Sequence, residues 1–391
     1  MTSSGRGSDR RGKLLLSLGS LLLALVFAEL ALRLFWTGPS LLKDPAHPFV
    51  LHPNPVYMPG VSGPAHFEPS PMGFRADPYP DGPAHRVIAL GGSTTECLGL
   101  DSDETWPALL QVELRTALGE PVWVGNGGLS GIRMRHHIVQ MENLLGRLPD
   151  LDAVVLLVGG NDFLRALRHT DPGEDWYEDP RERVRVHYEA FAVPARPDFG
   201  PFWERTELVH LLRRARQNLT WFRASVRTQE VADGRDYDAA RRLRASRPVV
   251  EELPDLGPAL VAYRRDLERT VELAERHGTR LVFATQPVMW EAGLPPALDS
   301  LLLLGEKDPA RPPVGPGSYS PAALAQGMTR FNEELLAVCA DRGLRCVDLA
   351  SLLPSDTTVF YDDVHFNESG ARKVATALAP ALAERLGTGP R

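Results

Sequence analysis

Short apolar runs alternate with longer segments of helical periodicity from residue 86 to the C-terminus. The runs have the length and composition of buried strands and cover residues 86–90, 122–124, 153–158, 281–284 and 346–349. Apolar residues recur at helical spacing over residues 104–118, 131–148, 257–277, 321–341 and 370–386. Strands that are apolar throughout and separated by helices indicate a parallel sheet covered on both faces, so we predict an α/β fold.

The N-terminal segment has a different pattern. Residues 14–28 carry no charge, the apolar pattern continues to Trp36, and basic residues precede it. Residues 14–36 are long enough to span a bilayer, and the positive-inside rule places residues 1–13 in the cytoplasm. We predict a signal anchor in the inner membrane, with the rest of the chain on the periplasmic or extracellular side. The alternative is a signal peptide cleaved at residues 26–28, which would give a secreted protein.

Proline is concentrated in residues 37–85, which hold 12 of the 34 prolines. Because proline fixes φ and lacks an N–H donor, we predict an extended linker that is not a packed element. Residues 72–75 near its end are either a docking point or an ordinary turn. The domain that follows is expected to span residues 86–390.

Residues 163–255 interrupt the alternation of strands and helices. This segment is rich in arginine, aspartate and glutamate and contains three of the seven tryptophans. It follows the third predicted strand, at the edge of the sheet where ligands bind in parallel α/β folds. We interpret it either as a lid or substrate-binding wall, or as a mobile and partly disordered insertion.

Charge and cysteine content argue against two classes of function, nucleic-acid binding and metal binding. The 391 residues carry a formal charge of −7; residues 1–39 contribute +3, so the remainder carries −10 (−7 minus +3). An acidic body argues against a nucleic-acid partner, which requires a basic face. The three cysteines lack metal-ligand spacing, so no metal site is expected. Cys339 and Cys346 could pair, but we expect both to be buried free thiols.

The candidate chemistry lies in four motifs, at residues 91–94, 126–131, 159–162 and 362–365. The first three follow predicted strands and the fourth lies in the loop after the last, so all four should meet at one edge of the sheet.

Three residues of these motifs form a candidate catalytic triad. Ser93 follows two glycines, which allow a sharp turn and a close approach of substrate, and we predict that it is a nucleophile. The alternative is that Ser93 is a helix N-cap. His365 is the predicted general base, and Asp362 can accept a hydrogen bond from its other ring nitrogen. Asp363 should then point elsewhere.

An acyl-transfer intermediate carries an oxyanion that needs two or three hydrogen-bond donors. The candidates are the backbone N–H of Ser93, the backbone N–H of Gly131 and the side-chain amide of Asn161. Glycine at position 131 permits close approach of the backbone, and asparagine donates while staying neutral.

Together the motifs resemble those of the SGNH/GDSL hydrolase family, whose four markers would fall on Ser93, Gly131, Asn161 and His365, with Asp362 matching its acid. The resemblance covers about residues 86–386. It implies a flavodoxin-like three-layer α/β/α sandwich, here with a large insertion after the third strand. It also implies hydrolysis or transfer of ester-linked acyl groups on lipids, sugars or polysaccharides, without a cofactor.

One residue departs from the family pattern. The usual Gly-Asp-Ser reads Gly91-Gly92-Ser93, so the aspartate before the nucleophile is missing. The leading hypothesis is a membrane-anchored serine esterase acting on short acyl esters, such as acetyl esters, of envelope glycans, lipids or small molecules. An O-acyltransferase of envelope polysaccharide with the same triad is one alternative, and a non-catalytic binding module on the same fold is another.

Overall fold

The computed structural model describes residues 6–35, 38–82, 84–148, 150–168, 175–216, 235–310 and 314–387. Its central sheet has five parallel strands in the order β4 (Val122–Asn126), β3 (His85–Gly91), β5 (Ala153–Leu157), β7 (Arg280–Ala284) and β9 (Cys346–Val347). In chain order this is 2-1-3-4-5, the flavodoxin-like arrangement. Each predicted strand is present.

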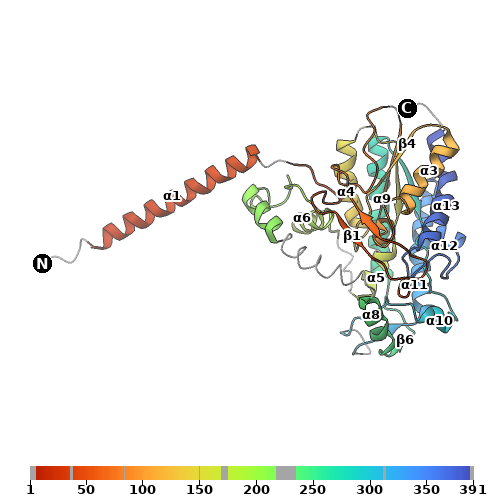
Figure 1. The fold of residues 1–391 in the computed structure, drawn as a ribbon. Coiled ribbons are helices and arrows are strands. Elements are labelled where there is room, and N and C mark those ends of the chain that lie inside the picture. The colour runs from red at the N-terminus through yellow and green to blue at the C-terminus, as the bar shows by residue number, and fades with distance from the viewer. Residues whose placement is uncertain are drawn as a thin grey trace.

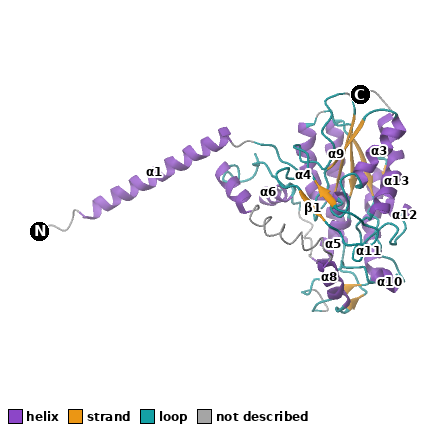
Figure 2. Cartoon of the chain, viewed as in Figure 1, coloured by secondary structure: helices purple, strands orange, loops and turns teal. Residues whose placement is uncertain are grey.

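Helices cover both faces of the sheet (Figures 1 and 2). On one face α3 (Trp106–Leu118) packs against α13 (Glu368–Gly387). On the other, α9 (Gly257–His277) contacts both α4 (Met134–Arg147) and α11 (Pro321–Asp341). The α/β class and the three-layer sandwich are therefore confirmed.

Shorter elements complete the described part of the domain. Helices occur at α2 (Ser93–Glu96), α5 (Gly160–Arg168), α6 (Pro180–Glu189), α8 (Arg235–Ala245), α10 (Pro296–Asp299) and α12 (Leu349–Leu352). The strand pair β6 (Val249–Val250) and β8 (Ser318–Tyr319) is parallel, and β1 (Phe49–Leu51) pairs with β2 (Ala65–Phe67) in antiparallel fashion.

Residues 38–82 pack against the domain, and the prediction of an unpacked linker is wrong. Leu42 and Phe74 are each only 1% exposed, because this strap carries large apolar side chains between its prolines. The docking interpretation of residues 72–75 is confirmed, since Phe74 and Arg75 are buried there. The buried guanidinium of Arg75 donates to the backbone carbonyls of His66, Glu96, Cys97 and Leu100.

Cys339 and Cys346 form a disulfide bond, so the expectation of two free thiols is wrong. Helix α11 ends at Asp341, and the chain reverses through Gly343, whose φ is +62°. This reversal brings the two Cα atoms to 6.2 Å, within the range that a disulfide requires. Cys97 is a buried free cysteine.

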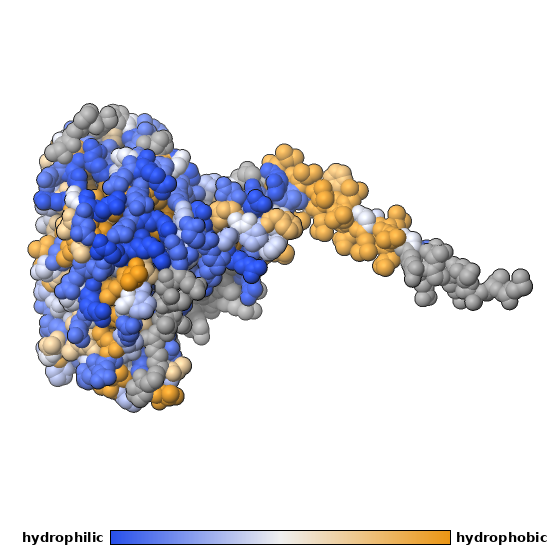
Figure 3. Space-filling model, turned by 180° about the vertical axis from the view of Figure 1, so that it is seen from behind, coloured by the Kyte–Doolittle hydropathy of each residue, from blue (hydrophilic) through white to orange (hydrophobic). Residues whose placement is uncertain are grey.

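Helix α1 (Arg6–Phe35) projects away from the body, and Figure 3 shows it as an apolar rod leaving a mostly hydrophilic surface. Its stretch Gly12–Phe35 is long and apolar enough to cross a membrane. Position 36 of the predicted anchor and residues 1–5 of the predicted cytoplasmic segment lie outside the described residues.

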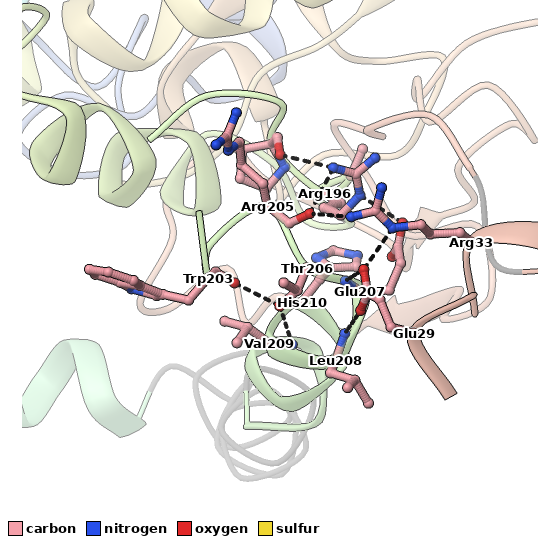
Figure 4. A network of polar contacts seen from close by, with 12 residues as sticks. Glu29, Arg33, Arg196, Trp203, Arg205, Thr206, Glu207, Leu208, Val209 and His210 are labelled. Atoms are coloured by element: carbon pink, nitrogen blue, oxygen red, sulfur yellow. Dashed lines mark hydrogen bonds and ion pairs between the residues drawn. The ribbon is translucent and has the colours of Figure 1, made fainter. Parts of the chain in front are cut away.

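The C-terminal end of α1 contacts the insertion (Figure 4). Glu29 accepts hydrogen bonds from the backbone N–H groups of Glu207 (3.0 Å) and Leu208 (3.1 Å). Arg33 pairs with Glu29 at 2.7 Å, as its i,i+4 spacing allows, and donates to the carbonyl of Arg205. Glu29 therefore binds the first turn of the helical segment 207–216, where free N–H groups are available.

The described part of the insertion is ordered against the domain. Helix α6 packs on α4, and the buried indole of Trp176 donates to Asp266 on α9 at 2.9 Å. Trp203, by contrast, is 45% exposed. Trp221 and residues 169–174 and 217–234 of the insertion lie outside the described residues.

Candidate active site

Three side chains from distant parts of the sequence form one chain of hydrogen bonds. The Oγ of Ser93 lies 2.8 Å from Nε2 of His365, and Nδ1 of His365 lies 2.7 Å from Oδ2 of Asp362. Oδ1 of the fully buried Asp362 accepts from the backbone N–H groups of Val364 and His365. The carboxylate thus holds His365 in the tautomer that leaves Nε2 free to accept the serine proton.

The elements of the sheet edge explain this convergence. Strand β3 ends at Gly91, and Ser93 is the first residue of α2, with Gly92 as the N-cap. The N-cap interpretation of Ser93 is therefore wrong. His365 lies in the loop before α13, which an antiparallel bridge between Phe360 and Phe366 closes on itself. The ring of Tyr361 stacks on His365 with centroids 5.6 Å apart.

Electrostatics favour a basic His365. Burial alone would lower the pKa of His365, but the Asp362 carboxylate, with smaller contributions from Asp363 and Glu96, raises it above its ordinary value of 6.5. Asp363 points elsewhere, as expected: it accepts from the indole of Trp290 and from the backbone N–H of Leu303. Burial raises the pKa of Asp363 to about 6.

Two of the three predicted oxyanion donors, Ser93 and Asn161, line the same small hollow. Asn161, in the first turn of α5, donates one hydrogen of Nδ2 to the carbonyl of Ile132 at 2.7 Å. The second hydrogen of this amide is the candidate donor to an oxyanion. Gly131 has a φ of +78°, which favours glycine, and is exposed. A side chain at Gly92 would overlap the Asn161 amide, so glycine leaves room for that amide in this protein.

A buried ion pair that sequence analysis missed supports the loop before Gly131. Glu96 accepts from the backbone N–H and the hydroxyl of Ser130. Lys43, from the proline-rich strap, lies 3.3 Å from Glu96 and also donates to the carbonyl of Gly128. Burial lowers the pKa of Lys43, and the Glu96 carboxylate opposes this effect. No sequence motif predicts this ion pair, because Lys43 and Glu96 are 53 positions apart in the chain.

Asp162, the last residue of the third motif, is half-buried. Its carboxylate accepts from the backbone N–H of Met134 at 3.1 Å, at the start of α4. Burial raises the pKa of Asp162 to about 7. This contact joins α5 to α4 on the far side of Asn161.

Two hollows meet at Asn161 and share Ile132 and Leu164 in their walls. The smaller has a volume of about 20 Å³ and lies against Ser93 and Gln286. The larger has a volume of about 610 Å³, and Gly131 is part of its wall.

Within the described ranges, no group of three His, Cys, Asp or Glu side chains is placed to hold a metal ion.

The profile of the GDSL-like Lipase/Acylhydrolase family matches residues 89–373. The chain belongs to this family. The GDSL enzyme is thus a carboxylic ester hydrolase. The matched region begins in β3 and ends in α13, so it includes all four motifs.

The GDSL enzyme is also similar to several solved structures. An α/β hydrolase from the metagenome of Lake Arreo, Spain, is 13% identical, with a TM-score of 0.40, over 77% of this chain and 96% of the other. An acetylxylan esterase from Geobacillus stearothermophilus is 13% identical, with a TM-score of 0.37, over 78% and 95%. A carbohydrate acetylesterase family member from Sinorhizobium meliloti is 14% identical, with a TM-score of 0.39, over 78% and 99%. No curated protein matches the chain.

Proposed function

We propose that the protein is a serine esterase that uses Ser93, His365 and Asp362 as a catalytic triad. The observation that carries this proposal is the continuous hydrogen-bonded chain from Ser93 Oγ through His365 to Asp362, at 2.8 Å and 2.7 Å. This is the geometry in which an imidazole removes a hydroxyl proton and a carboxylate stabilises the imidazolium that results.

In the proposed reaction Ser93 Oγ bonds to the acyl carbon while its proton moves to Nε2 of His365. The N–H groups of Ser93 and Gly131 and the amide of Asn161 stabilise the oxyanion. The bond to the alcohol then breaks, and the alcohol oxygen takes the proton from His365. Water attacks the acyl-serine with His365 as the base, which releases the carboxylic acid and restores Ser93.

The acyl group is short in this proposal. The hollow beside Ser93 holds about 20 Å³, and a single water needs about 10–15 Å³ on this measure. A methyl group fits such a space, so acetyl is the proposed acyl group. The adjoining hollow of about 610 Å³ then receives the alcohol portion, such as a sugar.

The proposed location is the inner membrane, with α1 as a single-pass anchor over residues 14–36 and the domain on the periplasmic or extracellular side. The 24-residue apolar stretch and the basic residues before it support this orientation. Esters of envelope glycans, lipids or small molecules are the substrates within its reach. Secretion after cleavage at residues 26–28 is the alternative.

The first test is hydrolysis of p-nitrophenyl acetate by the full chain, beside Ser93→Ala and the control Ser351→Ala, a change at an exposed serine on α12. We expect Ser93→Ala to lose activity by about a thousandfold or more while its circular dichroism spectrum is unchanged. Equal activity in Ser93→Ala and the parent would refute the proposed nucleophile.

Transfer to a sugar remains the second candidate, because the larger hollow has room for an acceptor. Acetate release with and without an acceptor sugar separates the two reactions. A hydrolase releases the same acetate in both mixtures, whereas a transferase forms acetylated sugar at the expense of acetate. The non-catalytic binding module is not proposed, because His365 lies within hydrogen-bond distance of Ser93.

A further inference from the structure

The larger hollow beside the oxyanion donors is lined by four arginines. Arg133 precedes α4, Arg165 and Arg168 lie on α5, and Arg185 lies on α6. We call this hollow the arginine cleft. The same wall includes Gly131 and Asn161, so the arginines face the space next to the reacting carbonyl.

The charge of the arginine cleft is opposite to that of the molecule. Its lining contains four arginines and one carboxylate, Glu189, which gives +3 (4 minus 1), whereas the whole chain carries −7. His136, also in the lining, adds no charge, because burial lowers its pKa. Its Nδ1 accepts from the backbone N–H of Arg133 at 2.8 Å, so its Nε2 donates to Glu189 at 3.2 Å.

Two of these arginines lie close to carboxylates. Arg185 pairs with Glu182 at 2.6 Å and approaches Glu189 at 4.0 Å. Arg168 lies 3.6 Å from Glu306, which is closer to Arg247, at 2.7 Å. Both arginines nonetheless line the hollow.

The exposure of the side chains allows a ligand to reach them. The side chains of Arg168 and Arg185 are each 48% exposed. Arginines on one helix face are commonly only a solvated surface, but these four come from three separate segments and converge on one hollow. Guanidinium groups bind carboxylate and phosphate oxygens through paired hydrogen bonds, and adjoining walls of a cleft strengthen that attraction.

We propose that the arginine cleft binds an anionic group on the alcohol portion of the ester, so that the substrate class is acylated saccharides bearing a carboxylate or a phosphate. This inference rests on the proposed function. The small hollow takes the acetyl group, the oxyanion donors hold the carbonyl, and the arginines hold the charged sugar in the adjoining hollow. Because the whole chain carries −7, we expect an anionic substrate to be attracted to the arginine cleft and repelled by the rest of the protein.

The test compares acetate release by the full-length protein from acetylated oligogalacturonate, which is anionic, and acetylated xylo-oligosaccharide, which is neutral. We expect kcat/KM to favour the anionic substrate by about tenfold at low salt. That preference should shrink between about 0.02 M and about 0.5 M salt, because salt screens exposed charges. Equal kcat/KM for both substrates would overturn the inference.

Variants assign the preference to the cleft. The double substitution Arg165→Gln and Arg168→Gln should reduce the anionic-to-neutral ratio about tenfold, mainly through KM. The matched control is Arg372→Gln, an exposed arginine on α13 at the other face of the sheet, which should keep the ratio. An unchanged ratio in the double variant would contradict the inference.

A binding experiment separates failure of this inference from failure of the proposed function. Full-length protein with Ser93→Ala is titrated with trigalacturonate, xylotriose and glucose 1-phosphate in a calorimeter. Tighter binding of either anion than of xylotriose supports the cleft even if no ester is cleaved, and the tighter anion identifies carboxylate or phosphate as the group recognised. Binding of neither anion overturns the inference, whatever the esterase assay shows.

Discussion

Gly92 separates the end of β3 from Ser93, at the position where the family usually carries an aspartate. A side chain there would overlap the amide of Asn161, which also approaches the carbonyl of Ile132. Glycine at position 92 therefore leaves room for the Asn161 amide beside Ser93.

We expect Gly92→Ala to displace Asn161 and lower kcat about a hundredfold, the usual cost of one oxyanion donor. Asn161→Ala should have a similar effect. The double variant should be no worse than either single one, because the overlapping partner is gone. Kinetics of all four proteins on p-nitrophenyl acetate give the measurement, and losses that multiply in the double variant would show that the two residues act separately.

The second prediction at the residue scale concerns pH. Only neutral His365 can accept a proton, and its pKa is raised, so kcat/KM should be low at acid pH and rise with a midpoint above 6.5. In Asp362→Asn the carboxylate that raises the pKa is gone and burial, which lowers it, remains. The midpoint of His365 should then fall below 6.5.

The pH profile of kcat/KM gives the midpoint for the parent protein. Nuclear magnetic resonance titration of the His365 ring gives it for Asp362→Asn, whose activity should fall about ten-thousandfold. A parent midpoint at or below 6.5, or an unchanged ring pKa in the variant, would be inconsistent with this account.

At the scale of elements, the proline-rich strap contributes directly to the loop beside the nucleophile. Lys43 on the strap and Glu96 at the end of α2 form a buried ion pair, and Glu96 also accepts a hydrogen bond from Ser130, before Gly131. Removing one member of a buried ion pair leaves the other charge uncompensated. The strap therefore matters for both stability and activity.

We expect Lys43→Met to lower the free energy of unfolding by about 3–5 kcal/mol, because Glu96 then stays buried without its cation. The double substitution Lys43→Met and Glu96→Gln should recover part of that loss, since no charge remains. Urea unfolding of the two variants and the parent measures both effects. If the single and double variants unfold at the same urea concentration as the parent, the pair contributes nothing.

At the scale of the whole molecule, α1 and the insertion are in contact through Glu29 and Arg33 (Figure 4). This places residues 205–208 beside Glu29 and Arg33, near the C-terminal end of the apolar helix. The arginine cleft belongs to the same insertion through α6. The proposed membrane anchor and the proposed substrate wall are thus connected in one part of the chain.

We expect the full chain to remain with the membrane fraction after an alkaline carbonate wash, with an intact N-terminus by mass spectrometry. Leu21→Arg together with Leu25→Arg should release it, because each charge at the centre of a span costs about 2.5–3.5 kcal/mol. Val56→Arg, at an exposed valine of the strap, is the matched control. A mature protein that begins near residue 29 would instead establish the cleaved signal peptide.

Several helix ends could be predicted from the capping residues beside them. Helix α9 ends where predicted, because Gly278 adopts the left-handed conformation after it, and α11 begins after Ser320, whose hydroxyl accepts from Ala323 N–H. The strand predicted over residues 346–349 ends at Val347, since Leu349 already starts α12. Such local changes of direction depend on neighbouring elements and leave little trace in periodicity.

The sequence by itself determined the order of strands and helices, the edge at which the motifs meet and the identity of Ser93, His365, Asp362, Gly131 and Asn161 as candidates. These features depend on local propensity and on the rule that parallel strands end at one edge. The tertiary structure alone decided the packing of the strap, the buried Lys43, the disulfide of Cys339 and the convergence of four arginines. Each of these depends on the distance between atoms far apart in the chain or on the direction of a turn, and neither is encoded in the pattern of any one segment.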